Sequence, residues 1–458
     1  MLEASIKTYG PDRWAEHEFG RAKLGDRRLV ERLKKIVARF AEQPSASIPK
    51  SCSGWAQTKG AYRFFAHPDI TSEALLRPHQ ERTQERCSQA PLVLVVQDTT
   101  GLTYGERAGL GLVGCGADGV KGLWLHSSMA FNEQGRALGL VRAEHWRRDP
   151  AGFGKAAKRH ERPTAEKESQ RWLNSFKDCV QWAQGAPATR WVNVADREAD
   201  IYELFATAAP HPEVGVLVRA RHNRKTTEGA DLDEVIKATP LAGRVEVAVP
   251  RKPGVAARTA CLEVRYAKVE VKAPARCQGE GLTLWIVEAR EASDKVGAIS
   301  WRLLTNLPVE NFEAALEKIK WYRLRWQIEE YHRILKSGCQ TQARQLETGD
   351  RLIKVLMLDV IVAWRVLELS RAARQSEAEA LEAYFCPEEI EVIKKHRARS
   401  SRKEQATLNL REAVRSVAQM GGFLGRKGDG EPGAMTLWRG LEVLANLVLG
   451  WRLAKTCG

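Results

Sequence analysis

The segment spanning residues 321–336 combines an acid, two bases and a phenol at helical spacing. Intervals of three, four and seven residues separate four side chains: Tyr322, Arg325, Glu329 and Lys336. At about 100° of rotation per residue, an α-helix would hold these side chains within about 60° of one another. Charged side chains are rarely buried without partners, so such a face is poor core material. It suits a surface that holds a metal ion and binds phosphate oxygens beside it.

Two further carboxylates follow short segments that are typical of buried strands. Asp98 lies at the end of Leu92–Val96, an unbroken apolar run, and Asp196 ends the strand-like run Trp191–Val194. A helix is predicted to follow over Arg197–Phe205. An acid at the end of a buried strand is exposed and rigidly held. Two such strand ends and one carboxylate from a helix could therefore meet at one or two divalent ions.

Two neighbouring acids are weaker candidates for this site. Glu330 could replace Glu329, but on a helix it would point about 100° away from the shared face. Asp200 lies one turn after Asp196 and is expected on a helix surface. The predicted set of metal ligands is therefore Asp98, Asp196 and Glu329.

Three motifs together resemble a known protein family. They are Gln97-Asp98-Thr99-Thr100, Asp196-Arg197-Glu198-Ala199-Asp200 and the Tyr-x2-Arg-x3-Glu-x6-Lys pattern that starts at Tyr322. They resemble the bacterial cut-and-paste DDE transposases of the insertion-sequence-four family, to which transposon-five transposase belongs. The likeness also covers Leu24–Asp26, Gly60–Phe64 and Glu166–Ser169, and it fades after about residue 350.

This resemblance implies an enzyme that binds transposon ends, excises the element through a hairpin intermediate and joins it to target DNA. The implied partners are double-stranded DNA and a second copy of the chain in a synaptic dimer. Asp98 would bridge two divalent ions. Asp196 would complete the coordination shell of one ion, and Glu329 that of the other. Two such ions lie about 3.5–4 Å apart in comparable sites. Carboxylate oxygens with open water positions favour Mg²⁺, with Mn²⁺ as a substitute.

Several side chains are predicted to contact the DNA. Tyr322, Arg325 and Lys336 would hold phosphates beside the cut. Trp301 lies 21 residues before Tyr322, as the base-stacking Trp of the family does, and would receive an extruded base. Without that aligned spacing, a core aromatic would be the better interpretation of Trp301. Further contacts are predicted for Trp326, which could stack on the far side of the base, and for Arg32, Arg63, Arg197 and Arg219.

The composition agrees with a nucleic-acid partner. The 458 residues carry a formal net charge of +15, which favours a polyanion, because neutralised phosphates release counterions. The nine cysteines are scattered without a CxxC pair, as expected of reduced thiols. No apolar run reaches 18 residues, and Met1–Gly10 lacks a signal-peptide core. These features predict a cytoplasmic protein without membrane association.

The elements that would position the site are predicted as an α/β, ribonuclease-H-like core. Strands are expected near 92–97, 124–132, 138–146, 190–195 and 214–219, with a helix over 165–185. Three strands that can pair as hairpins, followed by alternating helices and strands, give the order expected of that fold. The predicted division is a helical end-binding domain over 1–75, a catalytic domain over 76–350 with a β-rich insertion at about 241–300, and a helical C-terminal domain over 351–458.

The C-terminal region leaves alternatives open. Lys394–Lys403 is predicted as a basic loop and Gly421–Gly433 as a linker. The last helix carries apolar residues at spacings of four, three and four: Leu437, Leu441, Leu444 and Val448. They could pack within their own domain or mediate self-association. Two rival functions are a DNA-binding inhibitor of transposition without catalysis and a plain nuclease of the same fold.

Overall fold

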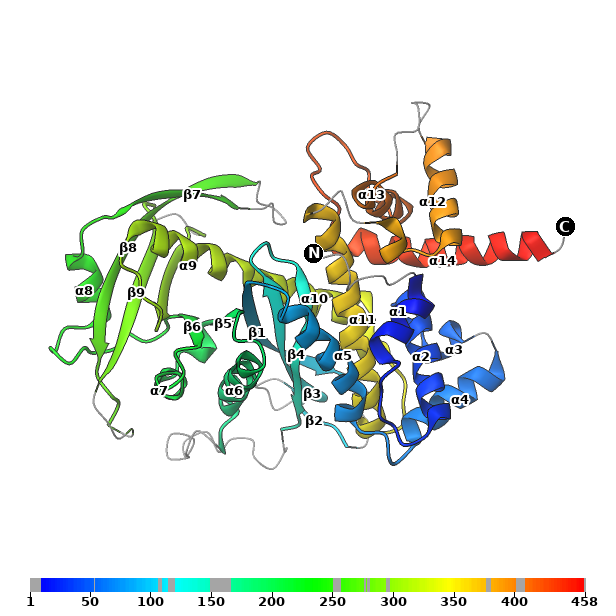
Figure 1. The fold of residues 1–458 in the computed structure, drawn as a ribbon, viewed down its shortest axis with the longest axis horizontal. Helices are drawn as coiled ribbons and strands as arrows, with labels where there is room; N and C mark the ends of the chain where they lie inside the picture. Colours follow the sequence, from blue (N-terminus) through cyan, green and yellow to red (C-terminus); the bar gives the residue numbers. More distant parts are fainter. Residues whose placement is uncertain are drawn as a thin grey trace. The chain divides into compact units, whose positions relative to one another are not determined.

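The computed structural model shows a mixed α/β protein with a mixed sheet and many helices (Figure 1). It describes residues 10–52, 54–105, 109–113, 120–148, 166–249, 257–275, 277, 281–293, 297–375, 380–400 and 408–456. The chain forms two compact units. The first unit contains Met1–Gln89, Thr99–Gly154 and Gln327–Gly458, and the second contains Ala90–Asp98 and Lys155–Trp326.

The second unit is built on a sheet with a parallel part and an antiparallel part. Its strands, in spatial order, are β1 (Leu92–Thr103), β5 (Arg190–Ala195), β6 (Val214–Arg219), β10 (Ser300–Thr305), β9 (Leu282–Glu291), β8 (Arg258–Val271) and β7 (Gly243–Val249). β1, β5 and β6 are parallel, whereas β10 runs antiparallel to β6. The parallel strands are almost entirely buried, which explains their continuous apolar sequences. The predicted strands are confirmed, including those between residues 241 and 300.

Helices cover this sheet on its faces. They are α6 (Gln170–Gln184), α7 (Tyr202–Ala208), α8 (Leu232–Ala238) and α9 (Phe312–Leu324). α6 buries Trp172, Phe176 and Cys179, which lie four and three residues apart on one helix face. The helix predicted over Arg197–Phe205 is instead a 3₁₀ turn over Arg197–Ala199 followed by α7.

The first unit contains a β-hairpin that packs against long helices. β3 (Lys121–Asn132) and β4 (Ala137–Trp146) are antiparallel, and β2 (Gly111–Leu112) pairs with β3. The end of β1 lies beside β3, because the Tyr104 amide donates to the Lys121 carbonyl at 3.0 Å. α5 (Ser72–Cys87) and α11 (Gly349–Gln375) both pack against β4. Along α11, apolar residues such as Leu352, Leu356 and Val360 are buried.

Helices from both ends of the sequence complete the first unit. They are α1 (Gly10–Phe19), α2 (Arg27–Glu42), α3 (Ile48–Ser51), α4 (Trp55–Ala66), α12 (Pro387–Ser400), α13 (Leu410–Met420) and α14 (Ala434–Thr456). The loop predicted over Lys394–Lys403 is wrong for its described part, since 394–400 form the end of α12; residues 401–403 lie outside the described residues. The linker predicted over Gly421–Gly433 does connect α13 to α14.

Candidate active site

Asp98 lies where the parallel pairing of β1 ends. The last paired residues are Val96 of β1 and Val194 of β5. The sequence predicts that the strand also ends here, but β1 continues to Thr103. The Asp98 side chain is 20% exposed, so its carboxylate is held at the end of the paired segment and remains reachable from solvent.

Asp196 occupies the equivalent place on the neighbouring strand. It follows Ala195, the last residue of β5, and its carboxylate accepts the Glu198 amide at 2.9 Å to cap the 3₁₀ turn. Asp98 and Asp196 both lie two residues beyond the Val96–Val194 pair. Neighbouring strands are about 4.8 Å apart, so the register brings the two acids together at one edge of the sheet.

Basic and phenolic groups surround the two acids. The Arg325 guanidinium lies 3.9 Å from the Asp98 carboxylate and 5.9 Å from the centre of the Tyr322 ring. Arg219, the last residue of β6, hydrogen-bonds Tyr322 and donates to the Ser300 carbonyl at 2.8 Å. These predicted phosphate contacts therefore gather beside the acids, all within the second unit.

The buried position of Tyr322 controls its protonation. Burial raises the pKa of the Tyr322 phenol, the positive charges of Arg325 and Arg219 lower it, and the nearby Asp196 carboxylate raises it. Burial also lowers the pKa of Arg219, although the contact with Tyr322 opposes that shift. Tyr322 therefore keeps its proton at neutral pH and can donate it to an anion.

Two tryptophans and one further arginine lie in the same unit. Trp301, in β10, packs edge-to-face against Tyr322, with ring centroids 5.7 Å apart and an interplanar angle of 68°. The Trp301 side chain is half-buried rather than fully buried in the core. Trp326 is 46% exposed. Arg197 is exposed, and its charge contributes to lowering the pKa of Arg219.

The helical segment that carries Glu329 is less regular than predicted. α9 ends at Leu324, α10 spans Trp326–Arg333, and the π-helix η5 follows over Ile334–Gly338. The prediction of one regular helix is therefore wrong, and its constant rotation per residue does not extend to Lys336. Glu329 and Lys336 belong to the first unit, and both side chains are half-buried. Burial lowers the pKa of the Lys336 ammonium.

Neighbours of Glu329 hold α10 within the first unit. Glu330 forms an ion pair with Arg371 of α11. The His332 ring lies 3.2 Å from the Ser127 hydroxyl of β3, and burial lowers the pKa of His332 to about 3. Glu330 thus serves an internal contact with α11.

Asp200 is a structural residue rather than the helix-surface acid that the sequence predicts. Its carboxylate is buried and accepts the amides of Arg221 at 2.6 Å and His222 at 2.8 Å. The Arg224 guanidinium also pairs with it, at 2.5 Å. Asp200 therefore fixes the turn after β6 and is not available to a metal.

The acids of the second unit suit a hard divalent ion. Asp98 and Asp196 offer carboxylate oxygens from two rigid strands, which are the donors that Mg²⁺ and Mn²⁺ prefer. Within the described residues, no three His, Cys, Asp or Glu side chains are grouped to hold one ion. The second unit therefore supplies two of the three predicted ligands, and Glu329 remains a prediction for the third.

The predicted end-binding residues lie on α2 and α4. The Arg32 guanidinium of α2 packs closely against Gly60 of α4. A Cβ atom added at Gly60 would lie only 2.6 Å from the Nη1 atom of Arg32. Arg63 is exposed on α4. The sequence interpretation missed Trp55, which begins α4 and is 76% exposed. No sequence pattern distinguishes this aromatic residue from a core residue, because its exposure depends on tertiary packing.

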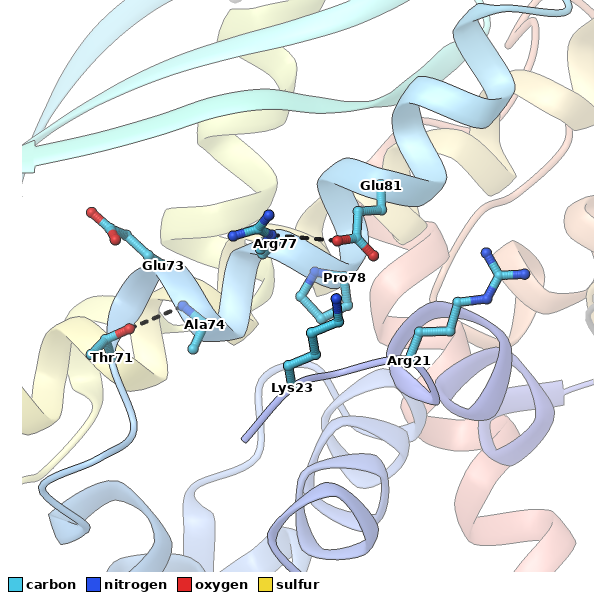
Figure 2. A pocket seen from close by; sticks show the side chains of 8 residues that line it. All are labelled: Arg21, Lys23, Thr71, Glu73, Ala74, Arg77, Pro78 and Glu81. Atoms are coloured by element: carbon cyan, nitrogen blue, oxygen red, sulfur yellow. Dashed lines mark hydrogen bonds and ion pairs between the residues drawn. The ribbon is translucent and has the colours of Figure 1, made fainter. Parts of the chain in front are cut away.

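A groove between the segment after α1 and α5 carries mixed charge (Figure 2). It has a volume of about 230 Å³ and is lined by Arg21, Lys23, Thr71, Glu73, Ala74, Arg77, Pro78 and Glu81. Arg77 pairs with Glu81 at 3.4 Å, and the Thr71 hydroxyl caps α5 by accepting the Ala74 amide at 3.1 Å. The acids offset the cations, so this groove is less suited to phosphate than the exposed basic face of α4.

Comparisons with known proteins match both ends of the chain. A family described as "Transposase DNA-binding" matches residues 11–70, and one described as "Transposase Tn5 dimerisation domain" matches residues 361–458. These matches support a DNA transposase that has DNA as a partner and forms a homodimer. More particularly, they confirm the predicted resemblance to transposon-five transposase: the chain is Tn5-like.

A solved structure is also similar to this chain. It is the piggyBac transposase synaptic complex with hairpin DNA, at 9% sequence identity and a TM-score of 0.39, covering 83% of this chain and 79% of that chain. Among the described residues, no helix is both long and apolar enough to cross a membrane.

Proposed function

We propose that this protein excises a transposable element by metal-dependent cleavage of both DNA strands, through a hairpin intermediate, and joins the element to target DNA. The observation that carries the proposal is the cluster in the second unit. Two acids end the paired parts of neighbouring parallel strands, and Arg219, Tyr322 and Arg325 gather beside them. An inhibitor without catalysis would have no need for this arrangement. The finer assignment to the insertion-sequence-four family rests on the three sequence motifs.

We further propose a ribonuclease-H-like catalytic core. The support is the parallel trio β1, β5 and β6, together with the antiparallel hairpin of β3 and β4. In such a core the first strand lies centrally and carries the first acid, and the next parallel strand carries the second. Asp98, within β1, and Asp196, which directly follows β5, agree with this order.

The chemistry assigns a role to each side chain. Asp98, Asp196 and Glu329 would hold two Mg²⁺ ions, with Mn²⁺ as a substitute. Such ions, when bound, activate the attacking oxygen and stabilise the leaving oxygen of an in-line displacement. Arg325 and Arg219 offer guanidinium forks to phosphate oxygens, and Lys336 offers a point charge.

Neutral hydrogen bonding and stacking would support the hairpin step. Tyr322 keeps its proton and can donate to a phosphate without adding charge. Hairpin formation bends the strand sharply, and extruding one base would relieve the crowding. Extrusion costs a few kcal/mol, whereas stacking on Trp301 or Trp326 returns about 1–3 kcal/mol per base.

Cleavage of a natural transposon end tests this function directly. The substrate is the inverted repeat that flanks the gene, incubated with the full-length protein and Mg²⁺. Nicked, hairpin and excised products are expected in that order. Absence of cleavage with both Mg²⁺ and Mn²⁺, despite specific binding to the repeat, would overturn the catalytic assignment and favour an inhibitor.

End binding should depend on Arg63. Replacing Arg63 with alanine removes an exposed cation from α4, so affinity for the end should fall and the slope of log affinity against log salt should decrease by about one. Fluorescence anisotropy at several salt concentrations measures both quantities. Arg244→Ala, which removes an exposed arginine from β7, is the matched control and should leave the slope unchanged. Equal effects of the two substitutions would contradict a specific role for Arg63.

Pairing of two transposon ends through a protein dimer should depend on the exposed face of α14. Leu437, Leu444 and Val448 are buried within the unit, whereas Leu447 is 44% exposed. Leu447→Glu should weaken dimerisation by about tenfold or more, because burying an unpaired carboxylate costs more than 1.4 kcal/mol. Analytical ultracentrifugation with end DNA measures the paired complex.

The matched control for this prediction is Leu424→Glu. Leu424 is 64% exposed but lies in the linker before α14. Leu424→Glu should therefore leave the paired complex intact. A paired complex that forms equally well with Leu447→Glu would show that another surface joins the two copies.

A further inference from the structure

A polar pair lies inside the parallel sheet, directly behind the two acids. The Gln97 side-chain amide donates to the Asn193 side-chain oxygen at 2.5 Å, and both side chains are fully buried. Asn193 in turn donates to the Cys179 sulfur of α6 at 3.6 Å. The pair therefore links β1, β5 and α6 within the second unit.

Neither amide is needed to fill the core. Buried amides must be hydrogen-bonded, and a well-made pair contributes only about 0.5–1.5 kcal/mol net. Replacing both partners with apolar groups of similar shape is often nearly neutral. A role in stability alone does not explain why two amides occupy the centre of an otherwise apolar sheet.

The apolar sequences of these strands do not specify their register. β1 reads Leu92-Val93-Leu94-Val95-Val96, and β5 contributes Trp191, Val192 and Val194. Sliding β1 by two residues would keep every side chain on its own face and would still bury aliphatic groups. The same slide would move Asp98 by about 6.6 Å relative to Asp196, at about 3.3 Å per residue. Two carboxylates displaced by that distance would no longer lie side by side around one ion, whose oxygen ligands lie about 2.0–2.1 Å from it.

The amide pair removes this ambiguity. Asn193 lies opposite Val95, and Gln97 reaches back to it from two residues further along β1. A two-residue slide would break the hydrogen bond between the two amides, and a buried polar group that loses its partner costs about 1–3 kcal/mol. Single buried polar residues are known to fix register in this way in coiled coils.

We propose that Gln97 and Asn193 are positioning residues that set the register of β1 against β5, and thereby the spacing of Asp98 and Asp196 for the metal. Side chains alternate along a strand, so Gln97 faces α6 while Asp98 faces the side of Arg325. The pair acts through the backbone and touches neither metal nor DNA. This inference rests on the proposed function, because it assumes that the two acids bind a divalent ion.

The test replaces the amide pair with apolar groups in the full-length protein. Gln97→Leu with Asn193→Leu should unfold at nearly the same denaturant concentration as the unchanged protein. The affinity of this double variant for Mn²⁺, measured by electron paramagnetic resonance without DNA, should fall about 10- to 100-fold. A loss of this size is usual when residues that orient the metal ligands are removed. The Mg²⁺ concentration needed for half-maximal cleavage should rise in parallel.

The matched control is Cys179→Ala. It removes the third member of the network while keeping the amide pair, so Mn²⁺ affinity should stay unchanged. A double leucine variant that is folded and keeps its Mn²⁺ affinity would overturn the proposal. If that variant does not fold, Gln97→Met replaces it, because methionine keeps the side-chain length. A fall in Mn²⁺ affinity for Gln97→Met supports the positioning role, and unchanged affinity overturns it.

Failure of the proposed function has a different signature. If the unchanged protein binds no Mn²⁺, or if Asp98→Ala does not alter its Mn²⁺ binding, the acids are not metal ligands and the function itself is wrong. If the unchanged protein binds Mn²⁺ and cleaves DNA while the double leucine variant behaves identically, only the role of Gln97 and Asn193 is wrong.

Discussion

Replacing Asp98, Asp196 or Glu329 with alanine should abolish strand cleavage while leaving end binding close to that of the unchanged protein. Each substitution removes a carboxylate that we propose as a metal ligand but leaves the exposed cations of α4 in place. Metal ions supply several kcal/mol of transition-state charge stabilisation, and a loss of about 4 kcal/mol corresponds to about 1,000-fold in rate. Cleavage and binding are measured on the same labelled end, so that a catalytic defect is separated from a folding defect.

The neighbouring acid provides the matched control. Glu329→Gln and Glu330→Gln remove the same charge from adjacent positions of α10. Glu330 pairs with Arg371, so its glutamine variant keeps a hydrogen bond and should cut at near-normal rates. Equal losses for the two variants would contradict the choice of Glu329 over Glu330. Substantial Mg²⁺-dependent cutting by Asp98→Ala or Asp196→Ala would remove the metal assignment altogether.

The sequence predicts the strands and the two strand-end acids because both follow from local pattern. A continuous apolar run such as Leu92–Val96 indicates a strand buried on both faces, and an acid beside it must emerge at the sheet edge. The parallel pairing of β1 with β5 then aligns Asp98 with Asp196. The two segments therefore predict the strands and their terminal acids, whereas the register that places the acids side by side comes from the structure.

Other features depend on contacts between distant segments and cannot be predicted in this way. Asp200 is buried because the turn after β6 supplies three donors to its carboxylate. The irregular winding from Arg325 to Gly338 is not visible in residue spacing. These positions are also where tertiary packing overrides local propensity.

The packing of the N-terminal segment also depends on contacts between distant parts of the sequence. Arg344 pairs with the buried carboxylate of Asp359 at 2.6 Å and donates to the carbonyls of Pro44 and Ala46. Its guanidinium also lies 4.4 Å from the centre of the Phe40 ring. Residues near the end of α2 are therefore packed into the same unit as α11. Point substitutions such as Arg63→Ala are consequently a cleaner test of end binding than removal of residues 1–75.

Trp301→Ala should separate the first nick from hairpin formation. Nicking requires the metal ligands and a water molecule, whereas hairpin closure requires a sharply bent strand that stacking supports. The variant should therefore nick at near-normal rates but form little hairpin. If stacking contributes about 1–3 kcal/mol, hairpin yield per nick should fall about 5- to 150-fold. Nicked and hairpin products are resolved on a denaturing gel over one time course.

The alternative is that Trp301 only packs against its neighbours. Truncation of a core tryptophan costs about 3–5 kcal/mol and would weaken every step together. The half-buried side chain, which contacts Tyr322 edge-to-face at 5.7 Å, favours a smaller loss of stability. Trp301→Phe is the matched control, because it keeps an aromatic face and should retain most of the hairpin product.

An end that lacks the extruded base distinguishes the two roles. Without that base nothing has to be accommodated, so Trp301→Ala should form hairpins on the abasic end almost as well as the unchanged protein does. Rescue of this kind cannot arise from restored folding, because the protein is the same on both substrates. An equal loss of nicking and hairpin formation, without rescue by the abasic end, would show that Trp301 is structural.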